Sequence, residues 1–128
     1  MAEFTDYMEN KIIDHMLRNQ SYTPPTTIYL ALFTSATNDA GGGTEVSGGS
    51  YARQAVTLAA ASGGATSNSS DITFPQATAN WGTITHCALF DASSGGNMLM
   101  HTALDESKTV NNGDTLKFNA GDLDISVD

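Results

Sequence analysis

The sequence predicts a mainly β protein: an antiparallel β-sandwich or jelly-roll-like domain with one N-terminal α-helix packed on it. Three observations predict this fold class. Apolar residues recur at helical spacing up to Leu17, and beyond it the apolar pattern has a period of two in short runs. Turn residues separate these runs, as they do in sandwiches. Charged residues make up only 15% of the chain and 12 of the 128 residues are glycine, which favours strands joined by turns.

The predicted helix spans residues 4–17. Its apolar positions follow at steps of three and four, and they are Phe4, Tyr7, Met8, Ile12, Ile13, Met16 and Leu17. Pro24-Pro25 mark the end of the helical region. Because so apolar a stripe is unstable in water and the link to the next strand is short, we expect the helix to cover the protein's own core. Ile12→Ala would then open a cavity and lower the free energy of unfolding by about 2–5 kcal/mol.

The first predicted strand, residues 27–34, is apolar on both faces. This pattern indicates a central strand covered on both sides, with the helix as the expected cover on one of them. Further strands are predicted at residues 51–58, 71–74, 81–90, 98–104, 115–119 and 123–128. The chain is one domain, 1–128, with the helix in residues 1–20 and the β domain in residues 26–128.

Side-chain alternation assigns faces within two of these strands. In residues 81–90, Ile84 is predicted to share a face with Ala88 and Phe90, opposite Cys87 and Leu89. The composition of residues 91–97 indicates a hairpin loop, so the flanking strands should pair antiparallel, and residues 105–108 are predicted as a polar link. In the last strand Leu123, Ile125 and Val127 are expected to face the core, and the aspartates between them to form a solvated acidic edge rather than a calcium site.

Residues 35–50 form a long glycine-rich loop, and long loops often make contacts. We expect this loop to touch another subunit or a neighbouring protein. The candidate contact residues are Gly41, Gly42, Gly43, Glu45, Tyr51 and Arg53. Arg53 is one of five cations, so it either pairs with an acidic residue of another subunit or lies solvated on its strand, and the second interpretation is slightly favoured.

The composition argues against several kinds of partner and chemistry. With 5 Lys and Arg against 14 Asp and Glu, the net charge is −9, which would repel nucleic acid and anionic membranes. The single Cys87 excludes an internal disulfide, and we interpret it as a buried apolar residue. His15, His86 and His101 lie outside any recognisable catalytic or metal-binding motif, although His86 and His101 could form a cross-strand pair. We expect no enzymatic activity, no cofactor and no bound metal.

Several segments, in their linked order, resemble a family of small tailed-bacteriophage virion proteins. These segments are residues 9–15 running into 22–34, then 43–54, 74–86 and 88–91, with Gly95-Gly96-Asn97. The resemblance covers nearly the whole chain. It implies a structural component of the virion without catalytic residues, and members of the family are described as head decoration, tail or tail fibre proteins.

A compact acidic β domain without repeats or a coiled-coil stalk favours a capsid decoration, or cement, protein among these alternatives. The alternative is a tail fibre, tail or baseplate component, and a third option is a carbohydrate-binding adsorption module. The expected partner is the major capsid protein, or neighbouring tail proteins. A homotrimer is expected, because copies grouped around a symmetry axis multiply weak contacts. The protein would be made in the host bacterial cytoplasm and would function in the virion.

Overall fold

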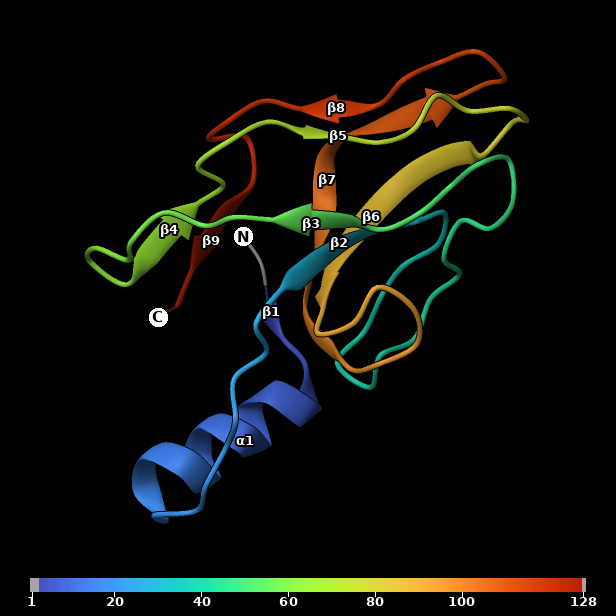
Figure 1. Ribbon diagram of the computed structural model, residues 1–128. Coiled ribbons are helices and arrows are strands. Elements are labelled where there is room, and N and C mark those ends of the chain that lie inside the picture. Colours follow the sequence, from blue (N-terminus) through green and yellow to red (C-terminus); the bar gives the residue numbers. More distant parts are fainter. Residues whose placement is uncertain (1–2, 128) are drawn as a thin grey trace.

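The computed structural model describes residues 3–127 and confirms a mainly β fold with antiparallel sheets and one helix near the N-terminus (Figure 1). In chain order the elements are β1 (Glu3–Phe4), α1 (Asp6–Leu17), β2 (Ile28–Phe33), β3 (Gln54–Val56), β4 (Ala65–Ser67), β5 (Ile72–Thr73), β6 (Gly82–Phe90), β7 (Met98–Val110), β8 (Lys117–Phe118) and β9 (Asp124–Ser126). Strand β1 includes Phe4, which was predicted in the helix, and β4 lies in residues 59–70, a small and polar segment that the sequence indicates as a connection or a weak edge.

Five strands form the main sheet in the order β1-β7-β6-β2-β3, and every neighbouring pair is antiparallel. Strands β4 and β9, and strands β5 and β8, form two short antiparallel ladders. The main core contains Leu30 and Leu32 of β2 together with Ile72 of β5 and Ile125 of β9. The two ladders therefore act as a divided second layer that packs on one face of the main sheet.

A smaller cluster lies on the opposite face of the main sheet and consists of Ala31, Phe33, Ala88, Phe90 and Met98. Strand β2 is thus buried on both faces, as predicted. The helix was expected to cover one of the two faces, and its Tyr7 and Met8 pack against the main core on the first face. Gly43 lies so close to Phe33 that a Cβ there would be 3.0 Å from the ring, and the Arg53 guanidinium lies 3.7 Å from the centre of the Phe90 ring. Loop residues therefore help to cover this face, and the start of the helix borders it, because Tyr7 lines a cleft together with Phe90 and Met98.

Strands β6 and β7 change register halfway along their length. Ile84 pairs with Lys108 but His86 pairs with Ala103, so residues 104–107 of β7 stand opposite Thr85 alone. This irregularity reverses the alternation, and Ile84 joins Cys87 and Leu89 in the main core. The predicted face of Ile84 is therefore wrong. The prediction of a polar link at residues 105–108 is also wrong, because these residues belong to β7.

Helix α1 begins after Thr5, whose buried Oγ1 accepts a hydrogen bond from the Met8 amide at 3.3 Å and donates one to the Met98 carbonyl at 2.6 Å. It ends at Leu17. Asn19 then adopts a left-handed conformation with φ of 56°, and the Gln20 amide donates back to the Asp14 carbonyl.

The helix packs on the domain near its start, where Tyr7 and Met8 contact the main core, and Figure 1 shows the remainder projecting away from the sheets. Ile13, Met16 and Leu17 are 49%, 69% and 80% exposed, and no residue of the helix is buried. The expectation that the whole stripe covers the core is wrong, because the helix leaves the domain after about two turns. The cavity expected for Ile12→Ala does not apply to a side chain that is only partly buried.

At the C-terminal end Leu123 and Ile125 are buried as predicted, whereas Val127 is 50% exposed because it lies beyond the end of β9. Asp128, predicted on the acidic edge, lies outside the described residues. Within residues 3–127 no helix has the length and apolar character needed to cross a bilayer.

Candidate functional site

Three of the six candidate contact residues come together in the structure. Glu45, Tyr51 and Arg53 form one hydrogen-bonded group, which we call the Arg53 cluster. Gly41, Gly42 and Gly43 lie elsewhere in the loop. Contact between any of these six residues and another protein stays a prediction.

The Arg53 side chain is 7% exposed and uses its guanidinium donors within its own chain. Nε and Nη2 donate to the two Glu45 carboxylate oxygens, each at 2.9 Å, in a bidentate pair. Nη1 donates to the carbonyls of Ala92 at 2.9 Å and Gly95 at 2.8 Å, both in the hairpin loop between β6 and β7. The guanidinium thereby ties the glycine-rich loop to the hairpin loop. The interpretation of Arg53 as a solvated strand residue is wrong, because the side chain is buried and pairs with Glu45 of the same chain. Its pairing with another subunit stays a prediction.

Tyr51 links the Arg53 cluster to the main sheet. Its hydroxyl donates to Glu45 at 2.7 Å and accepts from the Leu32 amide at 3.0 Å, while its ring packs against Trp81 and Phe74. Burial raises the pKa of Tyr51 well above its ordinary value, and the Glu45 carboxylate adds to the shift. For Glu45, burial pushes the pKa upward, but hydrogen bonds from Arg53 and Tyr51 and the Arg53 charge outweigh it and leave the pKa below its ordinary value. The cluster thus favours an ionised carboxylate.

The glycine-rich loop is held by its own chain. The Thr34 amide donates to the Thr44 carbonyl and the Val46 amide donates to the Leu32 carbonyl. The end of the loop is therefore hydrogen-bonded alongside the end of β2. Trp81 Nε1 donates to the Gly49 carbonyl at 2.9 Å. The order of this loop therefore requires no neighbouring protein.

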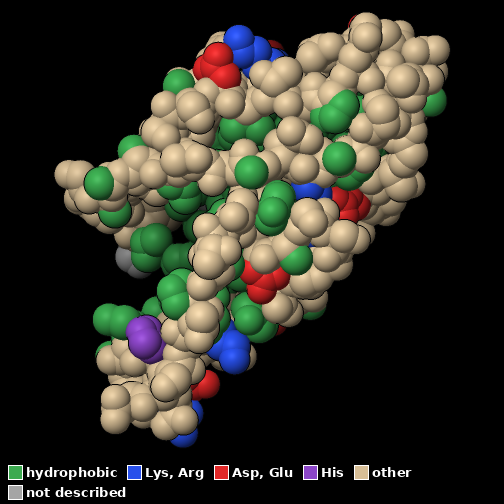
Figure 2. Space-filling view, in the orientation of Figure 1, with side chains coloured by type: hydrophobic (Ala, Val, Ile, Leu, Met, Phe, Trp, Pro, Cys, Tyr) green, Lys and Arg blue, Asp and Glu red, His purple; other side chains and the backbone are tan. Residues whose placement is uncertain are grey.

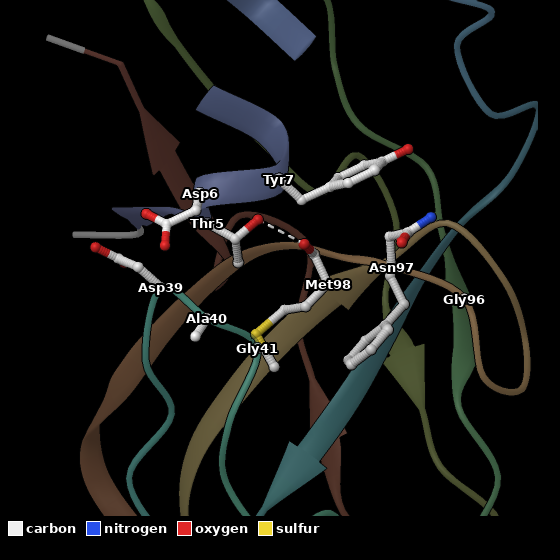
Figure 3. Close-up of a pocket in the computed structure, with 10 residues that line it drawn as sticks. Thr5, Asp6, Tyr7, Asp39, Ala40, Gly41, Gly96, Asn97 and Met98 are labelled. Carbon is white, nitrogen blue, oxygen red and sulfur yellow. Dashed lines mark hydrogen bonds between the residues drawn. The ribbon is translucent and has the colours of Figure 1, made fainter. Parts of the chain in front are cut away.

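A cleft of about 280 Å³ opens where the start of α1, the glycine-rich loop and the hairpin loop meet (Figure 3). The lining residues are Thr5, Asp6 and Tyr7 at the start of α1, Asp39, Ala40 and Gly41 of the glycine-rich loop, and Phe90, Gly96, Asn97 and Met98 of the β6–β7 hairpin. The polar side chains around the cleft present mainly oxygen atoms that accept hydrogen bonds. The cleft therefore suits hydroxyl or cationic groups better than anions. It shares Gly41 with the candidate contact residues.

A second feature, next to the cleft, is the exposed part of α1. Ile13, Met16 and Leu17 form an apolar surface, which we call the helix face, and Figure 2 shows hydrophobic side chains on the projecting part of the molecule. The spacing in the sequence predicted the apolar stripe, but the stripe alone did not show that only its first half would be covered.

The histidines occupy three unrelated places. His15 Nδ1 lies 3.0 Å from the Gln20 carbonyl, and His86 Nδ1 lies 2.8 Å from the Thr85 hydroxyl. The possible pair of His86 and His101 does not form, because the register of β6 and β7 places His101 opposite Ala88.

His101 instead meets two carboxylates that the sequence analysis missed. Its Nε2 lies 2.8 Å from Asp39 Oδ1 and 3.9 Å from Glu3 Oε2. Glu3 is the register partner of His101 in the β1-β7 pair, and Asp39 comes from the glycine-rich loop. The three residues are far apart in the sequence, and β1 is too short to leave a periodic pattern, so no spacing signal could have grouped them.

Cys87 is buried in the main core, and this burial raises the pKa of its thiol to about 12. The thiol is therefore protonated at neutral pH and unsuited to nucleophilic attack. This position agrees with the predicted role of Cys87 as a buried apolar residue.

Comparison with known proteins identifies the family. A model of the family described as Podophage GP4 fiber I protein gp80 matches residues 3–126, a span that includes every described strand, the helix and all six candidate contact residues. A comparison with curated proteins finds no match. The resemblance to small tailed-phage virion proteins is confirmed by the family match. The chain therefore belongs to the family of podophage GP4 fibre I protein gp80, a family of tailed-bacteriophage structural proteins.

Proposed function

We propose that this protein is a non-enzymatic structural subunit of a tailed-phage fibre that assembles through contacts between its own copies. The observation that carries the proposal is the fibre-family match over residues 3–126. It supports the fibre alternative better than capsid decoration, which the composition alone favoured.

The charged and nucleophilic side chains of the Arg53 cluster and the core have structural roles. Arg53 and Glu45 hold two loops together, and Cys87 is buried as a thiol. A guanidinium whose donors bind carbonyls and a carboxylate of the same chain has little capacity left for a substrate. These arrangements support a rigid subunit rather than a catalyst.

Trp81 and Tyr51 have structural roles rather than roles in carbohydrate binding. A sugar-binding platform requires exposed rings, but Trp81 is 6% exposed, and its ring and that of Tyr51 pack edge to face with centres 5.5 Å apart. These two rings stabilise the core instead.

The helix face is the surface that we propose for contacts between copies. Residues 6–18 carry three acidic and two basic side chains, a net charge of −1 in 13 residues, which per residue is close to that of the remainder of the chain. Charge therefore does not single out this surface, but exposed apolar area does. Ile13, Met16 and Leu17 are exposed on one side of the helix, so the helix face suits a second copy of this chain.

Immunogold electron microscopy of purified phage particles that contain this protein tests its location. Antibodies against the chain should place gold on the fibres. Gold distributed over the head would overturn the proposal and support capsid decoration. As an independent measurement, mass spectrometry of separated head and tail fractions should find the chain with the tail fraction.

A further inference from the structure

Glu3, Asp39 and His101 converge from β1, the glycine-rich loop and β7, and we propose that they bind a divalent transition-metal ion, Zn²⁺ in the first instance. Each residue offers one ligand atom, and the three atoms lie within 4.8 Å of one another. We call this group the His101 cluster. The inference is independent of the proposed fibre function, because it concerns the ligand chemistry of three side chains.

The geometry of the His101 cluster is close to that of a zinc site. Nε2 of His101 lies 2.8 Å from the Asp39 oxygen and 3.9 Å from the Glu3 oxygen. Ligand atoms about 2 Å from Zn²⁺ lie roughly 3.3 Å from one another in a tetrahedron, between these two distances. The Asp39 and Glu3 side chains are 49% and 70% exposed, so small rotamer changes can bring both oxygens to coordination distance.

The imidazole is already held in place for ligation. His101 is buried, its strand pairs on both sides, and its Nδ1 lies 2.8 Å from the Thr37 hydroxyl. When Nδ1 carries the proton and donates it to Thr37, the Nε2 lone pair points at the two carboxylates. A ring nitrogen fixed by a hydrogen bond on the other nitrogen is the usual arrangement of a histidine that binds a metal.

The charges around Nε2 favour a cation. In the described part of the chain, the ion pairs of Glu3 and Asp39 involve His101 and neither Lys nor Arg. A proton on Nε2 can bond to Asp39, but Glu3 at 3.9 Å is beyond hydrogen-bond distance. A divalent ion between the three atoms would compensate both carboxylates at once.

An ion can reach this position from solvent. A cavity of about 450 Å³ is lined by Glu3, Thr37 and His101 and leaves space for water as a fourth ligand. The mixed nitrogen and oxygen donors favour Zn²⁺ over Mg²⁺ or Ca²⁺, which bind mainly oxygen. Because the ligands come from three segments, the bound ion would fasten β1 and the glycine-rich loop to β7, next to the start of α1.

The test uses the full chain without a histidine tag, dialysed against a chelator and then titrated with Zn²⁺ by calorimetry and by thermal unfolding. We expect one Zn²⁺ per chain. At 100 times the dissociation constant, the unfolding temperature should rise by roughly 8 °C. Mg²⁺ at the same concentration should produce little change.

Ligand variants separate coordination from general charge. Asp39→Asn and Glu3→Gln should each weaken Zn²⁺ binding at least tenfold, as should Thr37→Val through the orientation of His101. Asp124→Asn and Glu106→Gln remove the same charges at exposed positions outside the cluster and should bind like the unmodified chain. If Asp39→Asn does not fold, Glu3→Gln, at a more exposed position, decides the question.

Two results would overturn the proposal. Absence of heat and of a thermal shift with millimolar Zn²⁺ would show that the His101 cluster is a hydrogen-bonded ion pair only. Unchanged Zn²⁺ affinity in folded Glu3→Gln and Asp39→Asn would place the binding at other residues.

Discussion

The Arg53 side chain joins three stretches of chain: the glycine-rich loop at Glu45, the hairpin loop at Ala92 and Gly95, and the end of β6 at Phe90. Its planar fork fits the Glu45 carboxylate in two places, and its face lies over an aromatic ring. A lysine can reproduce the charge of this group but neither the fork nor the stacking.

Arg53→Lys should therefore lower the free energy of unfolding by about 2 kcal/mol, measured by urea titration. Arg18→Lys is the matched control, since Arg18 pairs with Asp14 on the helix surface and both side chains are well exposed. The control should change stability by less than about 0.5 kcal/mol. Equal effects of the two substitutions would show that Arg53 does not fasten the loops.

Acid should weaken the Arg53 cluster in a definite direction. The pKa of Glu45 is below its ordinary value of 4.5 in the folded protein, so the unfolded chain binds the proton more tightly. The resulting stability is present above about pH 4.5 and is lost as the pH falls through the folded pKa. Between pH 5 and pH 3, the urea midpoint should fall more, or rise less, for the unmodified protein than for Glu45→Gln. Parallel pH curves for the two proteins would contradict this role of Glu45.

The sequence predicted which residues of this region to examine but not how they pair. Glu45, Tyr51 and Arg53 are close in sequence, yet their grouping depends on how the intervening loop folds across the edge of β2. The carbonyls of Ala92 and Gly95 carry no signal at all, because any residue supplies a backbone oxygen. The His101 cluster was missed for a similar reason: its members meet through sheet pairing and loop placement.

The glycine-rich loop illustrates how backbone conformation shapes an element. Gly43 has φ of 114°, and a Cβ there would be 3.0 Å from the Phe33 ring and 3.1 Å from the Ala36 carbonyl oxygen. Both features exclude a side chain, so this glycine allows the loop to cover the second face of the sheet.

Gly43→Ala should lower the free energy of unfolding by about 2–3 kcal/mol, because backbone strain and crowding act together. Gly48→Ala separates the two effects: Gly48 also has a positive φ, 75°, but a Cβ there would meet nothing within 4 Å. Its cost should be about 1 kcal/mol. Chemical unfolding of both variants measures the difference, and equal losses would remove crowding against Phe33 from the explanation.

Helix α1 has a packed start and an exposed remainder, and each part contains a methionine whose substitution tests its packing. Met8 packs against the main core, whereas Met16 is 69% exposed. Met8→Ala should cost about 1–2 kcal/mol of unfolding free energy, and Met16→Ala should change it by less than about 0.5 kcal/mol. A similar loss for both variants, measured by thermal or urea unfolding, would mean that the whole helix packs on the domain.

At the scale of elements, the sequence predicted the helix, the alternating strands and the central position of β2. Periodicity reports which face of an element is apolar but not what covers that face, so the projection of α1 could not be predicted. The face of Ile84 was wrong for a different reason. Alternation holds only while a strand stays in register, and the additional residues of β7 opposite Thr85 reverse it.

For the whole molecule, the exposed large apolar side chains are distributed unequally. Within residues 3–127, Ile13, Met16 and Leu17 lie on α1 and Val127 lies near the C-terminus, while the net charge of −9 is spread over the chain. A strongly acidic surface keeps copies apart except where attraction outweighs repulsion. The exposed apolar side chains of the helix face can supply that attraction.

The full chain should form a trimer in solution, with three times the mass of one chain by light scattering coupled to size-exclusion chromatography. The double substitution Met16→Ser, Leu17→Ser should convert it to a monomer, because it removes the two most exposed apolar side chains of the helix face. Circular dichroism should show that the fold is retained.

Val127→Ser is the control, since Val127 is also an exposed apolar residue, 50% accessible, but lies beyond β9 rather than on the helix. This control should remain trimeric. A monomeric unmodified chain would contradict self-assembly in solution, and a double variant that stays trimeric would move the contact between copies away from the helix face.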